Sequence, residues 1–238
     1  LGTLETPIAL TNTMNIGKVH DALVEYMARQ AEAHGVRLRS VNPIVGECND
    51  SALNEITERV IEKEHVFAAI ESAGVDFALG DVGAGKGTTC FGLKGGIGSA
   101  SRVFEVGKET YTLGVLVQSN CGEMENLRLD GKPIGRELAQ KLASSEQDKG
   151  SIMIVAATDM PVTSRQLQRI IKRAGVWLAR LGSFWGHGGG DIVIGFSTAQ
   201  RICSEESSGT IALRALNEEY INIPFSAMAD ATEEAVVR

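Results

Sequence analysis

Hydrophobic positions in the first third of the chain predict two strand–helix units. The apolar run at 7–11 (PIALT) is typical of a short buried strand, and the turn at 12–15 leads into a helix that ends near His34. Within this helix the apolar residues fall at i, i+4, i+7 and i+8, which gives one buried stripe: Val19, Leu23, Tyr26 and Met27. A second unit is expected as a strand near 43–45 and a helix from about 52 to 73.

The middle of the chain changes to a glycine-rich, β-like pattern between residues 75 and 122. Its largely apolar run at 111–117 (YTLGVLV) is typical of a strand buried on both faces. A helix is predicted at 131–143. The polar run at 144–150 (SSEQDKG) offers no apolar anchor, so we expect an exposed, mobile loop there.

The last third begins with the strongest predicted strand, at 151–157 (SIMIVAA). Thr163 or Ser164 can cap the following helix. Its apolar positions keep helical spacing: Leu167, Ile170, Ile171, Ala174, Leu178 and Leu181. A strand at 192–196, a further strand at 210–213 and a helix from about Phe225 complete the pattern, which predicts a single layered α/β or α+β domain.

Composition and charge narrow the class of protein. The 238 residues include 43% hydrophobic and 22% charged residues, which is typical of a globular domain. The net charge of −7, without a cluster of basic residues, argues against nucleic acid as a partner. The longest apolar run, 152–157, is far shorter than the ~20 residues of a membrane helix. We therefore expect neither nucleic acid nor membrane partners.

The cysteines and the start of the chain add two expectations. Four cysteines stand far apart without a C-x-x-C pair, which argues against a metal site and favours buried thiols in a reducing, cytoplasmic compartment: Cys48, Cys90, Cys121 and Cys203. No initiator Met opens the chain, so Leu1 is interpreted as a cut rather than a start.

One glycine-rich segment imitates a phosphate-binding loop. Residues 80–86 (GDVGAGK) satisfy G-x-x-x-x-G-K, which in nucleotide kinases leads into a helix whose N-terminus helps to bind phosphate. Five further glycines lie within residues 87–98, where each would cost up to ~1 kcal/mol in a helix. We therefore predict that these glycines serve close backbone packing and that nucleotide binding is the weaker alternative.

The junction of Gly150 and Ser151 allows two interpretations. Ser151 can be an ordinary residue at the start of a strand. It can also be an N-terminal nucleophile, because cleavage after Gly150 would release an α-amine beside the hydroxyl to act as its base. Such amines titrate near ~8, so a useful fraction is unprotonated at neutral pH.

Four separate motifs, in order, resemble the DmpA family of L-aminopeptidase/D-esterases and β-aminopeptidases. They are 94–102 (KGGIGSASR), 114–122 (GVLVQSNCG), 150–161 (GSIMIVAATDMP) and 190–198 (GDIVIGFST), with further agreement at 7–13 (PIALTNT). The resemblance covers essentially the whole chain. It implies a four-layer α-β-β-α sandwich of the N-terminal-nucleophile (Ntn) hydrolase type, truncated at both ends.

The resemblance also implies roles for individual residues. Self-cleavage at Gly150–Ser151 would place residues 1–150 in a larger subunit and 151–238 in a smaller one that stays associated. Ser151 would be the nucleophile, Asn120 the oxyanion donor and Asp191 the orienting acid, with no metal or cofactor.

The turn before Asp191 departs from the family pattern. Relatives carry a Ser two residues before the acid, whereas this chain has Gly189 there, and His187 is a candidate substitute polar group. The predicted function is a serine aminopeptidase or amidase that acts on short peptides, amides or esters and forms a homo-oligomer, a tetramer or larger. The alternatives are an uncleaved paralogue with a binding role and, less favoured, a P-loop kinase.

Overall fold

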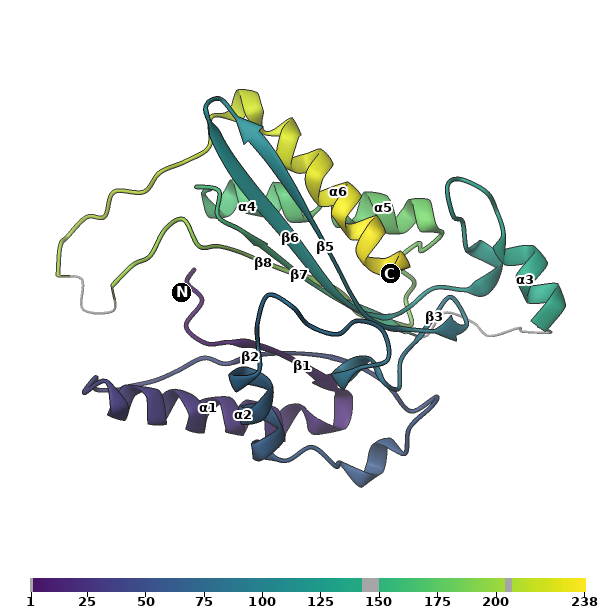
Figure 1. Cartoon of the computed structure of the whole chain (residues 1–238), viewed down its shortest axis with the longest axis horizontal. Coiled ribbons are helices and arrows are strands. Elements are labelled where there is room, and N and C mark those ends of the chain that lie inside the picture. The colour runs from purple at the N-terminus through teal and green to yellow at the C-terminus, as the bar shows by residue number, and fades with distance from the viewer. Residues whose placement is uncertain (1, 143–149, 204–206) are drawn as a thin grey trace.

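The computed structural model describes residues 2–142, 150–203 and 207–238 and arranges them in four layers (Figure 1). One outer layer consists of three helices, which cover one face of a four-stranded sheet. A two-stranded sheet lies on the other face of the four-stranded sheet, and two helices form the outer layer beyond it. The predicted α-β-β-α sandwich is therefore confirmed, with a second sheet of only two strands among the described residues.

The four-stranded sheet carries the main core. Its strands run in the order β5 (Gly96–Val106), β6 (Glu109–Asn120), β7 (Ser151–Thr158) and β8 (Asp191–Ser197). Neighbours are antiparallel except for β7 and β8, which are parallel. Alternate residues of β6 and β7 face the helices and are fully buried, as the period of two predicts: Leu113, Val115, Val117, Ile152 and Ile154.

The helical layer over this sheet consists of α4 (Ser164–Ile171), α5 (Ala174–Leu181) and α6 (Asn222–Val237). Figure 1 shows α6 lying along β5 and β6. This contact is close because a Cβ at Gly98 would stand 1.7 Å from the carbonyl oxygen of Ala235. Only glycine fits there.

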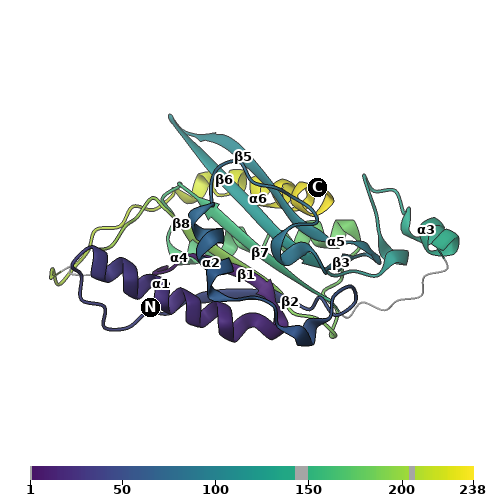
Figure 2. The same cartoon turned by 60° about the horizontal axis from the view of Figure 1, so that its bottom comes forward.

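The second sheet pairs β1 (Ile8–Asn12) in parallel with β2 (Ile44–Cys48). Helix α1 (Ile16–Ala33) packs against its outer face, and α2 (Lys63–Glu71) packs against α1 (Figure 2). The two sheets approach closely, because a Cβ at Gly46 would stand 2.6 Å from the Cε atom of Met153.

Smaller elements connect these layers. They are β3 (Thr89–Cys90), β4 (Leu93–Lys94), α3 (Gly135–Leu142) and the 3₁₀ turns at Thr13–Asn15, Ile56–Glu58, Gly83–Gly85, Met124–Asn126 and Glu218–Tyr220. The predicted mobile loop at 144–150 lies outside the described residues apart from Gly150. No helix in the described ranges is both long and apolar enough to cross a membrane.

The predicted helix at 52–73 is wrong in its first half. Only a 3₁₀ turn forms there, because Arg59 adopts a left-handed conformation (φ +50°) that interrupts a helix. The true helix begins at Lys63, where the backbone N–H of Glu62 donates to Nδ1 of His65 at 2.9 Å.

Three other predictions need correction. Thr163 caps α4 as expected. The single helix predicted to run on to Leu181 is divided into α4 and α5, because the backbone N–H of Arg173 donates to the carbonyl oxygen of Ile170 in a tight turn. Residues 207–217 form neither helix nor strand, so the strand at 210–213 is absent. Cys203 is exposed and Cys90 only partly buried, so the thiols are not all buried, and no disulfide joins any of the four cysteines.

Candidate active site

Ser151 is the first residue of β7, an interior strand with hydrogen-bonded neighbours on both sides. Its register partner in β6 is Asn120, so the candidate nucleophile and the candidate oxyanion donor lie opposite each other at the same end of the sheet. The side chain of Ser151 is partly exposed, and its Oγ atom accepts a hydrogen bond of 2.9 Å from the backbone N–H of Gly190.

Glycine at 150 and 189 is required by the close approach of backbone atoms around this serine. A Cβ at Gly150 would stand 1.7 Å from the carbonyl oxygen of Asn120. A Cβ at Gly189 would stand 1.6 Å from the carbonyl oxygen of Gly150 and 3.5 Å from the backbone nitrogen of Ser151. The turn at 186–190 therefore packs directly on the peptide bond between Gly150 and Ser151, and Gly189 provides the space for its carbonyl group.

The side chain of Asn120 is held in one orientation by a hydrogen bond from β3. Its Oδ1 atom accepts a hydrogen bond of 3.0 Å from the backbone N–H of Thr89, and the side chain is only 6% exposed. Because the oxygen is already used as an acceptor, the Nδ2 group remains as the donor of this side chain. An amide fixed in this way suits the stabilisation of developing negative charge.

Asp191 and His187 occupy different environments. Asp191 begins β8 and is the register partner of Ile152, one residue after Ser151. It is partly buried, and its charge is felt at the thiol of Cys48. His187 is exposed in the turn. The structure thus brings Ser151, Asn120 and Asp191 to one end of the four-stranded sheet.

Two buried polar residues near the site were not singled out from the sequence. The Sγ atom of Cys48 lies 3.4 Å from the carbonyl oxygen of Ser151 and 3.5 Å from that of Gln118. The side chain of Gln118 donates from Nε2 to the carbonyl oxygens of Thr11 and Ala84, each at 3.1 Å. Cys48 lies beyond the predicted strand at 43–45, although the observed strand includes it, and no local pattern could have shown that it reaches β7.

Burial dominates the electrostatics of this region. It raises the pKa of the Cys48 thiol to about 12, and the neighbouring carboxylates of Glu47 and Asp191 add to the effect. The thiol is therefore protonated at neutral pH and can donate a hydrogen bond.

The segment at 80–86, which resembles a phosphate-binding loop in sequence, packs against β5 instead of preceding a helix. A Cβ at Gly85 would stand 2.6 Å from the backbone nitrogen of Ile97, and the loop continues into β3. Lys94 fixes the loop by donating to the carbonyl oxygens of Gly85 and Gly95, both at 2.7 Å, whereas Lys86 is exposed. The prediction that these glycines serve backbone packing is confirmed for Gly85, Gly95, Gly96 and Gly98, each of which has a backbone atom within 3 Å of the place of a Cβ.

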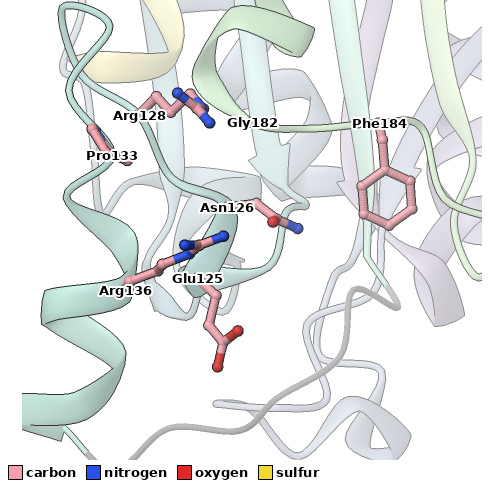
Figure 3. Close-up of a pocket in the computed structure, with 7 residues that line it drawn as sticks. All are labelled: Glu125, Asn126, Arg128, Pro133, Arg136, Gly182 and Phe184. Carbon is pink, nitrogen blue, oxygen red and sulfur yellow. The ribbon is translucent and has the colours of Figure 1, made fainter.

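A polar pocket of about 240 Å³ lies between the segment that follows β6 and the segment that follows α5 (Figure 3). Its lining includes two arginines and one aromatic side chain: Glu125, Asn126, Arg128, Pro133, Arg136, Gly182 and Phe184. A larger apolar pocket of about 750 Å³ separates β1 from α2 and the 50–62 segment. Within the described ranges, no three His, Cys, Asp or Glu side chains gather as a metal-binding group.

Comparison with known proteins agrees with this arrangement. The model of peptidase family S58 matches residues 1–238. β-Peptidyl aminopeptidase BapA of Sphingosinicella microcystinivorans is 37% identical over 250 residues, which cover 99% of this chain and 62% of that protein. The chain thus spans less than two thirds of the length of this relative.

Solved structures show the same fold. The PH0078 protein of Pyrococcus horikoshii OT3 superposes with a TM-score of 0.90 at 47% identity, over 99% of this chain and 65% of that one. The L-aminopeptidase D-Ala-esterase/amidase of Ochrobactrum anthropi, described as a variant of the Ntn hydrolase fold, gives 0.86 at 36%, over 96% and 63%. With its sequence matched from end to end and its Ntn-type fold shared with these relatives, the chain belongs to peptidase family S58.

Proposed function

We propose that this protein is a self-processing serine aminopeptidase that removes N-terminal residues from short peptides, amides or esters. The observation that carries the proposal is the position of Ser151, which begins an interior strand directly after Gly150 and opposite Asn120. The relatives described as β-peptidyl aminopeptidase and L-aminopeptidase support the substrate class.

Maturation begins with attack of Ser151 Oγ on the carbonyl carbon of Gly150. The C–N bond of the peptide breaks as the C–O bond of an ester forms, and the nitrogen of Ser151 takes up the proton from the hydroxyl. Water then hydrolyses the ester, which returns the hydroxyl and leaves Gly150 as a carboxylate. The hydrogen bond from Gly190 N–H to Oγ and the close packing at Gly189 hold the reacting groups for this step.

The mature enzyme uses the α-amine of Ser151 as its general base. The amine takes the proton from Oγ as this atom attacks the carbonyl carbon of the substrate, and the amide of Asn120 donates to the resulting oxyanion. The proton passes to the leaving amine, and water releases the acyl group from Ser151. Asp191, at the start of the adjacent strand, orients the amine.

The same scheme assigns the two products of cleavage. Residues 1–150 belong to the larger subunit, and residues 151–238 belong to the smaller one. Because β7 and β8 pair with β6 inside one sheet, the two subunits stay associated after cleavage. We also propose that cleaved pairs assemble into a homo-oligomer in the cytoplasm.

The decisive test is the intact mass of the purified protein beside a Ser151→Ala variant, with Ser101→Ala as a matched control on the exposed part of β5. We expect two fragments, one beginning at Ser151, in the wild type and the control, and a single chain in Ser151→Ala. A single uncut mass for the wild type would refute the proposal and favour an uncleaved paralogue with a binding role.

A further inference from the structure

The two sheets of the sandwich are joined by polar contacts at the point where the candidate nucleophile lies. Most contacts of Ser151 are made within its own sheet, with β6 and β8. Cys48 is different, because it belongs to β2 in the other sheet and reaches the carbonyl oxygen of Ser151 at 3.4 Å. Cys48 is the last residue of β2, and its sulfur contacts the site.

The same sulfur also contacts the strand that carries the oxyanion donor. It lies 3.5 Å from the carbonyl oxygen of Gln118, two residues before Asn120 in β6, and the backbone N–H of Met153 in β7 donates to it. One side chain therefore contacts both strands of the site. The position of this side chain therefore determines how far Ser151 and Asn120 lie from the second sheet.

Gln118 strengthens this connection from the opposite direction. Its side chain is fully buried and donates to the carbonyl oxygens of Thr11 in β1 and Ala84 in the glycine-rich loop. Two polar groups thus cross an interface at which Gly46 and Met153 also come close. Directional hydrogen bonds in such a place fix the register of the sheets more narrowly than apolar contacts do.

Because the thiol is fully buried, its hydrogen bonds face little competition from water. The proton stays on the sulfur at neutral pH, as described above, so the group acts as a hydrogen-bond donor. The thiol is held away from solvent, which argues against a role as a second nucleophile. The thiol of Cys48 lies beside Ser151, and as a buried hydrogen-bond donor it is suited to hold that residue in place.

We propose that Cys48 is a positioning residue: its single S–H, shared between the carbonyl oxygens of Ser151 and Gln118, sets the place of the nucleophile opposite Asn120. The proposal rests on the function assigned to Ser151 above. Because Cys48 places the reacting groups, loss of its hydrogen bond should lower the rate of bond cleavage and leave the binding of substrate unchanged.

The test compares Cys48→Val with Cys48→Thr, two side chains of the same shape that differ in the hydroxyl donor. An exposed cysteine replaced in the same background, Cys203→Val, is the control. In Cys48→Val we expect self-cleavage and kcat to fall about tenfold with KM unchanged, which is the size of effect of one lost hydrogen bond. Cys48→Thr should restore most of the rate at equal thermal stability.

Equal rates in the valine and threonine variants would overturn the proposal, as would a loss that follows thermal stability in both. Crystal structures of the two variants give a readout independent of activity: Ser151 should shift relative to Asn120 in Cys48→Val and keep its place in Cys48→Thr. If the wild type fails to cleave itself, the proposed function fails, and the crystal structures still decide whether Cys48 positions Ser151.

Discussion

Two glycine-rich segments of this chain look alike in sequence and differ in what their glycines make room for. In the loop at 80–87 a side chain at Gly85 would collide with the backbone of β5. In the turn at 186–190 a side chain at Gly189 would collide with the carbonyl oxygen of Gly150, which belongs to the bond expected to break. The first segment makes room for a scaffold and the second for a reacting group.

The two segments nevertheless reach the same site, at two residues that lie opposite each other in the sheet. The backbone N–H of Thr89, just after the loop, donates to Asn120, whereas the turn donates from Gly190 to Ser151. The loop therefore serves the site through a neighbour, and the turn serves it directly. This difference predicts where substitutions reduce the rate of reaction and where they reduce stability.

The largest effect is expected at Asn120, the residue whose side chain the backbone N–H of Thr89 orients. In Asn120→Ala we expect kcat to fall by ~10²–10³ with little change in KM, because a donor to the oxyanion is lost. Steady-state kinetics on a short peptide amide measures it, with Asn217→Ala, which removes only the cap of a distant turn, as the control. An unchanged kcat would remove Asn120 from the mechanism.

The turn should control the rate of self-cleavage. In Gly189→Ala the new Cβ would displace the carbonyl group of Gly150, and a misplacement of this kind can cost ~10²-fold in rate. The fraction of cleaved chain over time, read by intact mass, measures it. Gly114→Ala, where a Cβ meets nothing within 4 Å, should cleave normally. Cleavage of Gly189→Ala at the wild-type rate would contradict the role given to this turn.

The loop should control stability instead. In Gly85→Ala the Cβ would stand 2.6 Å from the backbone nitrogen of Ile97, and we expect a loss of ~1–3 kcal/mol in the free energy of unfolding. Urea denaturation of the Ser151→Ala background, which keeps one chain, measures it. Gly17→Ala in α1 meets nothing within 4 Å and should not destabilise. If Gly85→Ala leaves stability unchanged in this background but prevents self-cleavage in a chain that keeps Ser151, the contrast between the segments is lost.

The two lysines beside the loop offer a smaller test of the same contrast. Lys94→Met removes donors to the carbonyl oxygens of Gly85 and Gly95 and should cost ~1–2 kcal/mol. Lys86→Met removes an exposed side chain and should change stability by less than ~0.5 kcal/mol. A larger loss of stability in Lys86→Met than in Lys94→Met would contradict the role assigned to Lys94.

A further effect concerns the pH dependence of stability and develops only in alkaline solution. Because the pKa of Cys48 is raised to about 12 in the folded state, its contribution to stability is complete below its ordinary value of 9.0 and is lost as the pH rises toward 12. The difference in unfolding free energy between wild type and Cys48→Thr should thus change only above pH 9. A constant difference from pH 7 to 11 would contradict this.

The sequence was sufficient for the elements whose patterns are strong and local. The apolar stripe of α1 and the runs in β6 and β7 predicted three of the main elements. The junction at Ser151 left two interpretations open, and the resemblance to a family made Ser151 the candidate nucleophile. Prediction failed where one residue overrides a pattern, as Arg59 does with its left-handed conformation. Apolar spacing carries no information about such a conformation.

The parts of the site that escaped prediction depend on contacts between distant residues. Cys48 and Ser151 are 103 positions apart, and Gln118 and Thr11 are 107 apart. Only the packing of one sheet on the other brings these pairs together. Asn120 was selected through resemblance to a family, and the contact that orients it, with Thr89, became visible only in three dimensions.

The interior position of β7 has a consequence for the life of the molecule. Before cleavage, unfolding and refolding involve one chain and can be reversed. After the cleavage proposed at Gly150, the strand that starts at Ser151 would remain paired between β6 and β8, yet a molecule that unfolds would release two chains that must find each other again. Refolding would then depend on concentration, and the proposed cleavage would turn a reversible fold into one whose lifetime is set by how slowly it unfolds.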